Sequence, residues 1–411
     1  MGIEYGERRS TFIDYGRPSL FLDFAKRKSL VDAISRNNLI TFTRSSTGTY
    51  VGSDGYIKTA AADEPRFDHD PVTGESLGLL IEESRFNRHL NSNISGVIIY
   101  NPFGSFTKST DNTILTPYGD FSGVAKITTL KNPVGGFATG RWGSSVGTMA
   151  AGTTYTFSFF IKGQQSLVNL LRAGYQVFSP TYEESAISVG SLSSQTYPND
   201  WKRYYWTYTP QNTQTGIFYL GIQIGNIPVG TIYYTFGFQL EQGSFPTSYI
   251  PTSGSAVTRQ PDNTKITGTN FTDFYNSDEG TIYSEYTYGI RPWHFADDDE
   301  SPYQRFFAFA DPSGGIRVGR NTGSYTYLSA PTTGSYGRGD NIKSVAAYDN
   351  TNFVVGAFGQ VATSGTTNGN TGIDRLLFYQ VTSNPDTNGT IKKLLYYPTR
   401  LTDTQLQALT Q

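Results

Sequence analysis

Apolar and polar residues alternate with a period of two along the middle of the chain, from about residue 93 to residue 262. Successive side chains of a strand point to opposite faces of a sheet, so this period predicts strands. In the clearest segment, residues 231–240, one predicted face carries Ile232, Tyr234, Phe236, Phe238 and Leu240. Similar segments are separated by Gly, Pro, Asn and Ser turns, which predicts a β-sandwich.

The same alternation returns between residues 263 and 411. It occurs at residues 280–288, 305–310, 343–348, 353–358, 373–379 and 391–397. Near the end, Thr402 and Gln405 have the spacing of a capping box, in which side chains satisfy the free backbone N–H groups of a helix start. We therefore predict a second β-sandwich that ends in a short helix.

Residues 1–92 have a less regular pattern. Residues 40–43 read as a short strand, and Gly52-Ser53-Asp54-Gly55 supplies a hairpin turn. A short helix is predicted within residues 23–35, where it could bury Phe24, Leu30, Val31 and Ile34. Because few apolar residues remain for a separate core, we expect this segment to pack on a neighbouring domain, on a symmetry mate or on a larger particle.

The length of 411 residues allows two or three domains, which the changes of pattern place at residues 1–92, 93–262 and 263–411. Aromatic residues make up 15% of the chain and Gly occurs 44 times. Aromatic residues suit strands and Gly suits turns, so this composition favours an all-β protein.

Charge, cysteine content and targeting features limit the binding partners and the location that we expect for the protein. The net charge is −2 without a long basic run, so nucleic acid is not expected to bind. The absence of Cys excludes disulfides and thiolate metal sites, and fits folding in a reducing cytosol. The first ten residues lack the apolar core of a signal peptide, and no run of 18 apolar residues occurs, so we expect a soluble protein without membrane insertion.

Five sequence pieces stand in order near the start of the chain: Leu22-Asp23-Phe24, residues 40–50, Asp54-Gly55, residues 64–70 and residues 78–85. Together they resemble a module near the front of many tailed-phage virion proteins. The resemblance implies synthesis in the bacterial host cytoplasm, a place in the virion on the tail or particle surface, and an attachment or assembly role for residues 1–92. Its implied partners are other virion proteins and further copies of this chain in a homotrimer.

Two later stretches also resemble known families. Trp201-Lys202-Arg203-Tyr204 is similar to a strand of carbohydrate-binding-module jelly rolls, and residues 236–262 resemble the end of such a domain in phage proteins. The last predicted strand and residues 401–406 resemble the end of concanavalin A-like sandwiches. The implied fold class is all-β, with a jelly roll and a concanavalin A-like lectin sandwich, both antiparallel, after a small and mostly irregular module with short β-hairpins.

Sugar binding on a β-sandwich usually needs a flat aromatic ring and neighbouring hydrogen-bonding groups. Trp142 and Trp293 stand among turn-forming residues and are the candidate carbohydrate-binding residues. Trp201 and Trp206 lie within strand patterns, and we expect them in the core.

Acidic residues offer a weaker candidate site. Asp297, Asp298, Asp299 and Glu300 could supply oxygen ligands to calcium, but consecutive acids cannot all point inward, so a solvated loop is favoured. No other cofactor is indicated. Asp68-His69-Asp70 could form a ligand trio, yet a turn held by side-chain to backbone hydrogen bonds is favoured.

Catalytic patterns fit poorly. Residues 143–147 match the Gly-x-Ser-x-Gly pattern of a nucleophile elbow, but the strand before it and the helix after it are missing from the sequence pattern. We predict no catalytic residues and no enzyme activity. The expected function is that of a phage tail fibre or tail-tip protein that binds host-surface polysaccharide. The alternatives are a capsid-decoration or baseplate-plug protein and, less favoured, a polysaccharide depolymerase.

Overall fold

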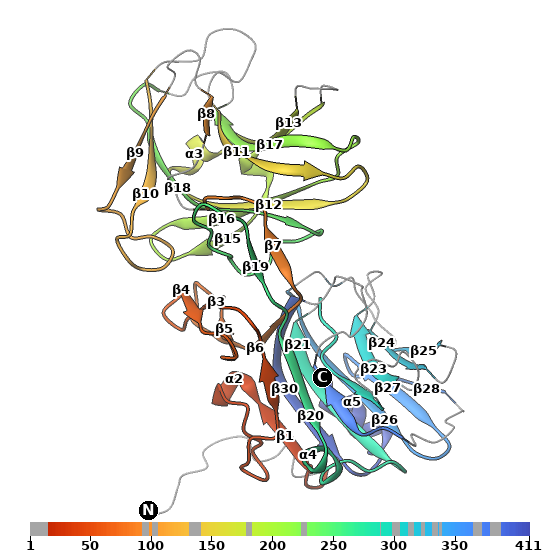
Figure 1. The fold of residues 1–411 in the computed structure, drawn as a ribbon. Helices are drawn as coiled ribbons and strands as arrows, with labels where there is room; N and C mark the ends of the chain where they lie inside the picture. Colours follow the sequence, from red (N-terminus) through yellow and green to blue (C-terminus); the bar gives the residue numbers. More distant parts are fainter. Residues whose placement is uncertain are drawn as a thin grey trace, which may run out of the picture.

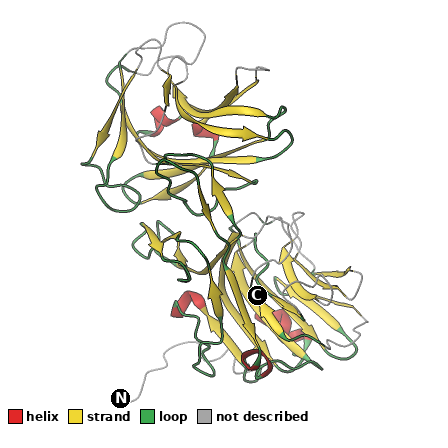
Figure 2. Cartoon of the chain, viewed as in Figure 1, coloured by secondary structure: helices red, strands yellow, loops and turns green. Residues whose placement is uncertain are grey.

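The computed structural model describes residues 15–92, 98–100, 106–130, 141–177, 183–222, 228–287, 289–297, 305–310, 316–321, 325–330, 336, 339–364, 372–378 and 388–411. Their strands form antiparallel sheets in two β-sandwiches, one above the other in Figure 1. Helices are few and short (Figure 2). The predicted all-β fold class, with two antiparallel sandwiches, is confirmed. No helix among the described residues has the length and apolar character to cross a bilayer.

The first sandwich has a six-stranded and a five-stranded sheet. The six-stranded sheet runs in the order β15 (Ser193–Tyr197), β16 (Trp201–Tyr208), β12 (Tyr155–Lys162), β18 (Ile232–Gln242), β10 (Val124–Thr129) and β9 (Phe106–Asp111). The five-stranded sheet runs in the order β14 (Glu183–Ser188), β13 (Leu171–Val177), β17 (Gln214–Ile222), β11 (Arg141–Met149) and β8 (Ile98–Tyr100). Two short helices, α3 (Gln165–Val168) and η2 (Val189–Ser191), join its strands.

A β-bulge at Gly237 divides β18 into two halves. Ser158 pairs with Gln239 and Phe160 pairs with Phe236, so a two-residue step on β12 faces a three-residue step on β18. Gly237 has a φ of 64°, which glycine adopts without the strain of a side chain. The single face predicted for residues 232–240 is therefore wrong, because the bulge reverses the alternation after Phe236.

The second sandwich also has two sheets, and both include strands from the start of the chain. The larger runs β28 (Gln360–Ser364), β27 (Phe353–Ala357), β26 (Asn341–Tyr348), β21 (Gly280–Thr287), β30 (Asn388–Tyr397), β6 (Ser76–Glu82) and β5 (Phe67–His69), with β1 (Leu20–Asp23) also on β30. The smaller runs β2 (Thr41–Thr43), β20 (Asn263–Thr267), β29 (Arg375–Leu377), β22 (His294–Ala296), β23 (Arg305–Ala310), β24 (Ile316–Asn321) and β25 (Tyr325–Ser329).

Helices of the second sandwich and the module are short. The predicted terminal helix is α5 (Asp403–Leu409), and its Thr402–Gln405 capping box is confirmed. A one-turn helix, α4 (Thr269–Thr272), follows β20. The helix predicted within residues 23–35 is only α2 (Phe24–Arg27), because Lys28 adopts a left-handed conformation that ends it.

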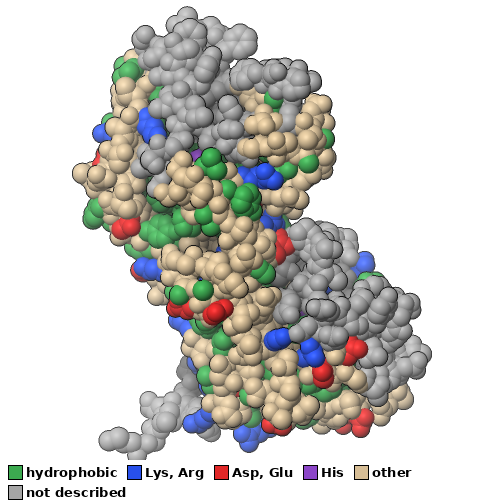
Figure 3. Space-filling model, in the orientation of Figure 1, with side chains coloured by type: hydrophobic (Ala, Val, Ile, Leu, Met, Phe, Trp, Pro, Cys, Tyr) green, Lys and Arg blue, Asp and Glu red, His purple; other side chains and the backbone are tan. Residues whose placement is uncertain are grey.

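Two further strand pairs involve the N-terminal part of the chain. β3 (Gly48–Val51) pairs with β4 (Ile57–Ala60) through the predicted turn at residues 52–55. β7 (Arg85–Asn87) pairs with β19 (Val257–Arg259) at the waist between the sandwiches (Figure 1). Figure 3 shows apolar side chains gathered on the part of the first sandwich nearest this waist, whereas charged side chains are scattered.

The N-terminal module has no core of its own, because its apolar residues divide between the two sandwiches. Val51 and Ile57 belong to the core of the first sandwich. Leu20, Leu22 and Ile81 belong to the core of the second. Of the three expected packing partners, the neighbouring domains are the ones observed. The predicted division at 92 therefore does not separate hydrogen-bonded units, since the module supplies strands to the second sandwich.

A fragment of residues 93–411 is expected not to fold into two cooperative sandwiches. It lacks β1 and β6, which cover one edge of β30, and the core residues Leu20, Leu22, Leu79 and Ile81. Thermal unfolding followed by circular dichroism would test this. A chain of residues 15–411 is the matched control, because it keeps these strands. A fragment that melts as cooperatively as this control, at the same temperature, would contradict the shared core.

Candidate functional site

Five charged side chains from four segments of the chain meet at the junction of the module and the sandwiches. We call Arg44, Arg66, Glu82, Arg259 and Asp262 the ionic cluster, and each is at most 1% exposed. Arg66 binds both acids, with Nη1 2.7 Å from Glu82 Oε2 and Nη2 on Asp262. Arg44 Nη1 lies 3.0 Å from Asp262 Oδ1, and Arg259 Nε lies 3.4 Å from Glu82 Oε2.

Backbone groups complete the ionic cluster and tie it to the chain. The N–H of Glu82 donates to Asp262 Oδ2 at 2.9 Å, and the N–H of Asp262 donates to the carbonyl of Glu82 at 2.9 Å. Arg44 donates to two carbonyls in the loop at residues 61–64, at 2.6 and 2.9 Å. Ser248 donates its N–H and its hydroxyl to the Glu82 carboxylate, each at 2.7 Å. The ionic cluster therefore fixes several segments against one another.

The ionic cluster accounts for charged positions in the stretches that resemble phage proteins. Arg44, Arg66 and Glu82 lie in three of the five module pieces, and Arg259 and Asp262 lie at the end of residues 236–262. Sequence reasoning did not bring these residues together, because their partners are far apart in the chain. The structure gives the charged positions an internal, architectural role.

Burial and charge compete within the ionic cluster. Burial disfavours the Glu82 carboxylate, but the guanidinium groups of Arg259 and Arg66 outweigh it and lower the pKa of Glu82 to about 2. Burial likewise disfavours the charged form of Arg66, yet Asp262 and Glu82 raise its pKa above the usual value. Both groups thus stay charged across the physiological range.

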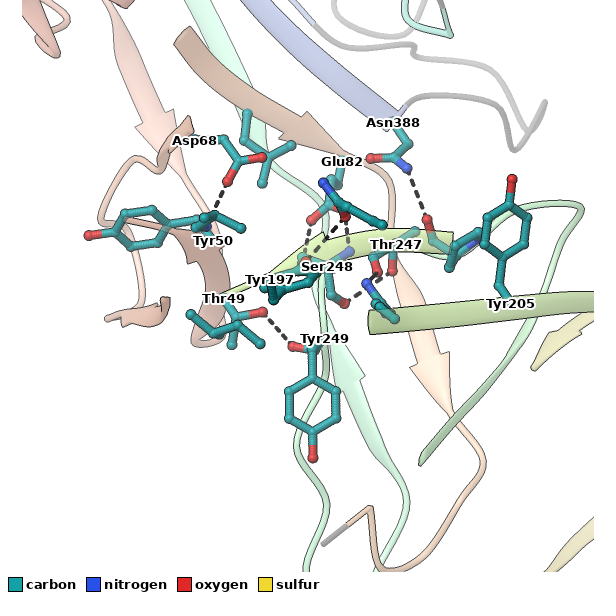
Figure 4. A pocket seen from close by; sticks show the side chains of 16 residues that line it. Thr49, Tyr50, Asp68, Glu82, Tyr197, Tyr205, Thr247, Ser248, Tyr249 and Asn388 are labelled. Atoms are coloured by element: carbon teal, nitrogen blue, oxygen red, sulfur yellow. Dashed lines mark hydrogen bonds between the residues drawn. The ribbon is translucent and has the colours of Figure 1, made fainter. Parts of the chain in front are cut away.

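A cavity of about 200 Å³, the junction pocket, lies beside the ionic cluster (Figure 4). Its wall includes Tyr50 and Asp68 of the module, Tyr197 and Arg203 of the first sandwich, and Asn388 of the second. Small-molecule sites usually measure about 300 to 1,000 Å³, so this volume suits water or a very small ligand.

Within Asp68-His69-Asp70, the predicted hydrogen-bonded turn is confirmed only at Asp70, because Asp68 and His69 lie in β5. Asp68 accepts a bond from the N–H of Val51 at 2.6 Å, and His69 Nδ1 lies 2.9 Å from the carbonyl oxygen of Val51. Asp70 accepts a bond from the N–H of Thr73 at 2.7 Å. These side chains are engaged with the backbone.

A larger cavity, of about 460 Å³, lies between β18, the loop at residues 112–123 and the segment at residues 249–253. We call it the aromatic pocket because Tyr118, Phe236 and Tyr249 line it. Their ring centroids are 5.8 to 6.2 Å apart at steep interplanar angles. Its volume falls within the usual range for small-molecule sites, which makes it the better candidate.

Polar groups line the rest of the aromatic pocket, from Ser92, Thr110, Asp120, Ser122, Thr252 and Ser253. Thr116 and Ser122 donate their hydroxyls to Asp120 Oδ1 at 2.6 and 2.9 Å. Partial burial opposes ionisation of Asp120, but these bonds outweigh it and hold its pKa below the ordinary value.

The phenols of the aromatic pocket stay protonated, because burial raises the pKa of Tyr118 and of Tyr249 well above the usual value. Tyr249 donates its hydroxyl to Ser92 Oγ at 2.7 Å. The aromatic pocket thus places apolar ring surface beside fixed hydrogen-bonding groups, which is the combination that a sugar requires.

Trp142 does not stand in a loop. It lies within β11, where it pairs with Ile99 and Leu220, and its side chain lies outside the described residues. The Gly-x-Ser-x-Gly pattern at residues 143–147 lies in the same strand. A nucleophile elbow requires a sharp turn from a strand into a helix, so this segment does not form one.

Trp293 is buried in the core of the second sandwich, with 1% of its surface exposed. Its indole N–H donates to Ser284 Oγ at 3.3 Å, and its ring packs against Phe295 and Phe306. The prediction that Trp293 stacks on a sugar is therefore wrong, because the indole packs into the core against Phe295 and Phe306. Trp201 and Trp206 lie in the core of the first sandwich, as predicted.

The acidic loop is only partly described. Asp298, Asp299 and Glu300 lie outside the described residues, and half-buried Asp297 follows the end of β22. Within the part of the chain that the structure describes, no three His, Asp or Glu side chains gather closely enough to hold a metal ion. Calcium binding at residues 297–300 stays a prediction.

Phe121 is an exposed aromatic residue that the sequence analysis did not single out. It is 58% exposed and stands between Asp120 and Ser122, which both line the aromatic pocket. The residues around it, Tyr118-Gly119-Asp120-Phe121-Ser122-Gly123, are as rich in turn formers as those around Trp142. The same rule would have found Phe121 had it not been restricted to Trp.

Comparisons with known proteins do not assign a family. No family model and no curated protein sequence matches the chain. Solved structures with partial similarity include a NanB sialidase from Streptococcus pneumoniae, at 14% identity and a TM-score of 0.30. That alignment covers 36% of this chain and 26% of the sialidase, so the chain spans about a quarter of its length.

Two further solved structures have lower scores. The tandem CBM22 domains from Paenibacillus barcinonensis Xyn10C are 11% identical, with a TM-score of 0.25 and coverage of 77% of this chain and 100% of that chain. The tail fibre protein gp63.1 from an E. coli phage is 11% identical, with a TM-score of 0.21 and coverage of 92% and 41%. At such scores these neighbours assign neither a ligand nor an activity to this chain.

Replacing Asp262 by Asn is expected to lower the free energy of unfolding by about 3 to 5 kcal/mol, because it leaves the buried guanidinium of Arg44 without its anion and removes one of the two anions that Arg66 contacts. Chemical denaturation measures the change. Asp54→Asn is the matched control, since Asp54 pairs with Lys58 at the surface and such pairs contribute about 0 to 1 kcal/mol. Equal losses in both variants would contradict the importance of the ionic cluster.

The Asp68 carboxyl is expected to make stability depend on pH. Burial raises its pKa to about 7, whereas an unfolded Asp titrates near about 4. The folded protein binds this proton more tightly, so this group's contribution to stability falls as the pH rises from about 4 to about 7. Asp68→Asn should therefore gain stability relative to the unmodified chain between these values, as measured by thermal melting.

Asp54→Asn is again the control for the pH experiment, because the pKa of Asp54 lies below its ordinary value. Its stability difference from the unmodified chain should stay constant above about pH 5. A constant difference for Asp68→Asn from about pH 4 to about pH 8 would show that Asp68 titrates normally.

Proposed function

We propose that this chain is a virion protein of a tailed phage, a tail fibre or tail-tip component that binds host-surface glycans without cleaving them. The aromatic pocket is the observation that carries the proposal, since it combines aromatic rings, hydroxyls and one carboxylate in a cavity of about 460 Å³. The resemblance of the module to phage virion proteins supports the setting.

In the proposed complex, the exposed Phe121, which stands in sequence between the pocket-lining residues Asp120 and Ser122, covers the apolar C–H face of a sugar ring. Tyr118 offers a partly exposed ring, while Phe236 and Tyr249 are nearly buried and shape the inner wall. Asp120 accepts hydrogen bonds from sugar hydroxyls. These contacts supply binding and orientation, and the proposal includes no catalytic step.

Each such contact with a sugar is weak, so the proposed function depends on several copies of the chain. A homotrimer would present three aromatic pockets, and tethered sites raise the overall affinity without any new contact. The module would hold the sandwiches in place and, with other virion proteins, join the chain to the particle. Calcium at residues 297–300 is compatible with this arrangement and is not required by it.

A structural role is the second candidate, as a capsid-decoration or baseplate-plug protein that binds other virion subunits. It is favoured by large apolar side chains at the surface, such as Val72 at 67%, Val229 at 62% and Phe86 at 43% exposure. Exposed apolar surface often marks protein interfaces. This candidate needs no sugar site at all.

The proposal is tested with the full chain, displayed at high valency on a glycan array that includes bacterial surface polysaccharides. We expect binding, and we expect Phe121→Ala to weaken it by about tenfold, since ring contacts contribute about 0.5 to 1.5 kcal/mol beyond their burial. Phe86→Ala removes an exposed Phe of the waist and should bind like the unmodified chain.

Two results would change the assignment. Absence of binding to any glycan at high valency would favour the structural candidate. Release of new reducing ends from a bound polysaccharide would show a depolymerase.

A further inference from the structure

The charge in the lining of the aromatic pocket is negative and comes from one side chain. Asp120 is the one charged side chain among the described residues that line it. The other polar groups there are hydroxyls, and burial keeps the phenols of Tyr118 and Tyr249 protonated. A ligand in the aromatic pocket therefore meets a negative charge without a compensating cation in its lining.

The Asp120 carboxylate is fixed before any ligand arrives. Its Oδ1 accepts bonds from the hydroxyls of Thr116 and Ser122 and from the N–H of Ser122 at 3.3 Å. Its backbone carbonyl accepts the N–H of Thr116 at 2.9 Å. These bonds all go to Oδ1 or the backbone, which leaves Oδ2 to accept bonds from outside the loop. A fixed acceptor binds a donor with little loss of side-chain freedom.

A carboxylated sugar would interact unfavourably with this arrangement. Two negative groups a few ångströms apart at a protein surface repel strongly enough to reduce affinity by about tenfold or more. A carboxylate is also acceptor-only, so it cannot donate to Oδ2. A neutral sugar hydroxyl, or an amino group, can donate to it.

We infer that the aromatic pocket binds sugars with hydroxyl or amino substituents and excludes those with a carboxylate, and that Asp120 sets this selectivity. The inference rests on the proposed function, because it assumes that the aromatic pocket is the sugar site. It narrows the ligand to neutral or amino sugars, in contrast to polymers of uronic acids.

The test compares sugars that differ in one group. Oligomers of glucose, galactose and mannose are measured against the glucuronate, galacturonate and mannuronate oligomers, which carry a carboxylate at C6. Isothermal titration of the full chain at low salt should show at least about tenfold tighter binding of a neutral oligomer than of its acidic counterpart. Binding that is equal, or tighter for the uronate, would overturn the inference.

Variants assign the selectivity to Asp120. In Asp120→Asn, the amide oxygen can still accept the hydrogen bonds of Thr116 and Ser122. The ratio of the affinity for a neutral oligomer to the affinity for its acidic counterpart should then fall to about one. Asp120→Glu keeps the charge and should keep the preference for neutral sugars. Asp200→Asn removes an equal charge from a side chain that is 95% exposed on the same sandwich, and should leave the ratio unchanged.

Failure of the inference can be told apart from failure of the proposed function. If neither neutral nor acidic oligomers bind, the sugar site itself is refuted and the selectivity with it. If neutral oligomers bind and Asp120→Asn keeps the full preference over uronates, the site stands and the role of Asp120 is refuted.

Discussion

Charged groups that are buried must find partners, and this requirement organises the junction of the protein. A guanidinium or carboxylate that is removed from water loses roughly several kcal/mol of hydration free energy. Only close opposite charges and hydrogen bonds offset this loss. Arg66 meets this requirement through contacts with both Glu82 and Asp262. Because these acids come from distant parts of the chain, the contacts of one side chain hold β6 of the module against the segment before β20.

The same interactions shape the aromatic pocket. Ser248 donates two hydrogen bonds to Glu82, and the next residue, Tyr249, donates its hydroxyl to Ser92 and accepts a bond from Thr49 at its carbonyl. The ring of Tyr249 then lines the aromatic pocket. The buried charges and the candidate sugar site are thus two ends of one hydrogen-bonded path, although only one of them is open to a ligand.

Local sequence features were predictable where neighbouring residues decide the outcome. The Thr402–Gln405 capping box and the turn at Asp70 each depend on contacts within a few residues. The burial of Trp293 depends on β21 and β23, which its own segment does not reveal. A two-residue period likewise cannot show that Gly237 interrupts it, because a bulge needs the register of the partner strand.

The ionic cluster and the aromatic pocket could not be predicted from the sequence, because each combines residues that are far apart in the chain. Arg44 and Asp262 are separated by more than two hundred positions, and the local sequence around each residue does not indicate that the other is its partner. The aromatic pocket combines Phe236 with a loop around Asp120 that pattern analysis treats as a connection. The resemblance to phage proteins identified several of these stretches, but it did not show which of their side chains contact one another.

The pairing of β1 with β30 has a consequence for synthesis. Leu20 to Asp23 pair with Lys393 to Tyr396, so β1 leaves the ribosome long before its partner strand β30 is made. Until then its edge and its leucines stay available to other nascent chains, a state in which strands aggregate readily. Truncated translation products lack this closing partner, so premature termination yields chains that cannot complete the second sandwich.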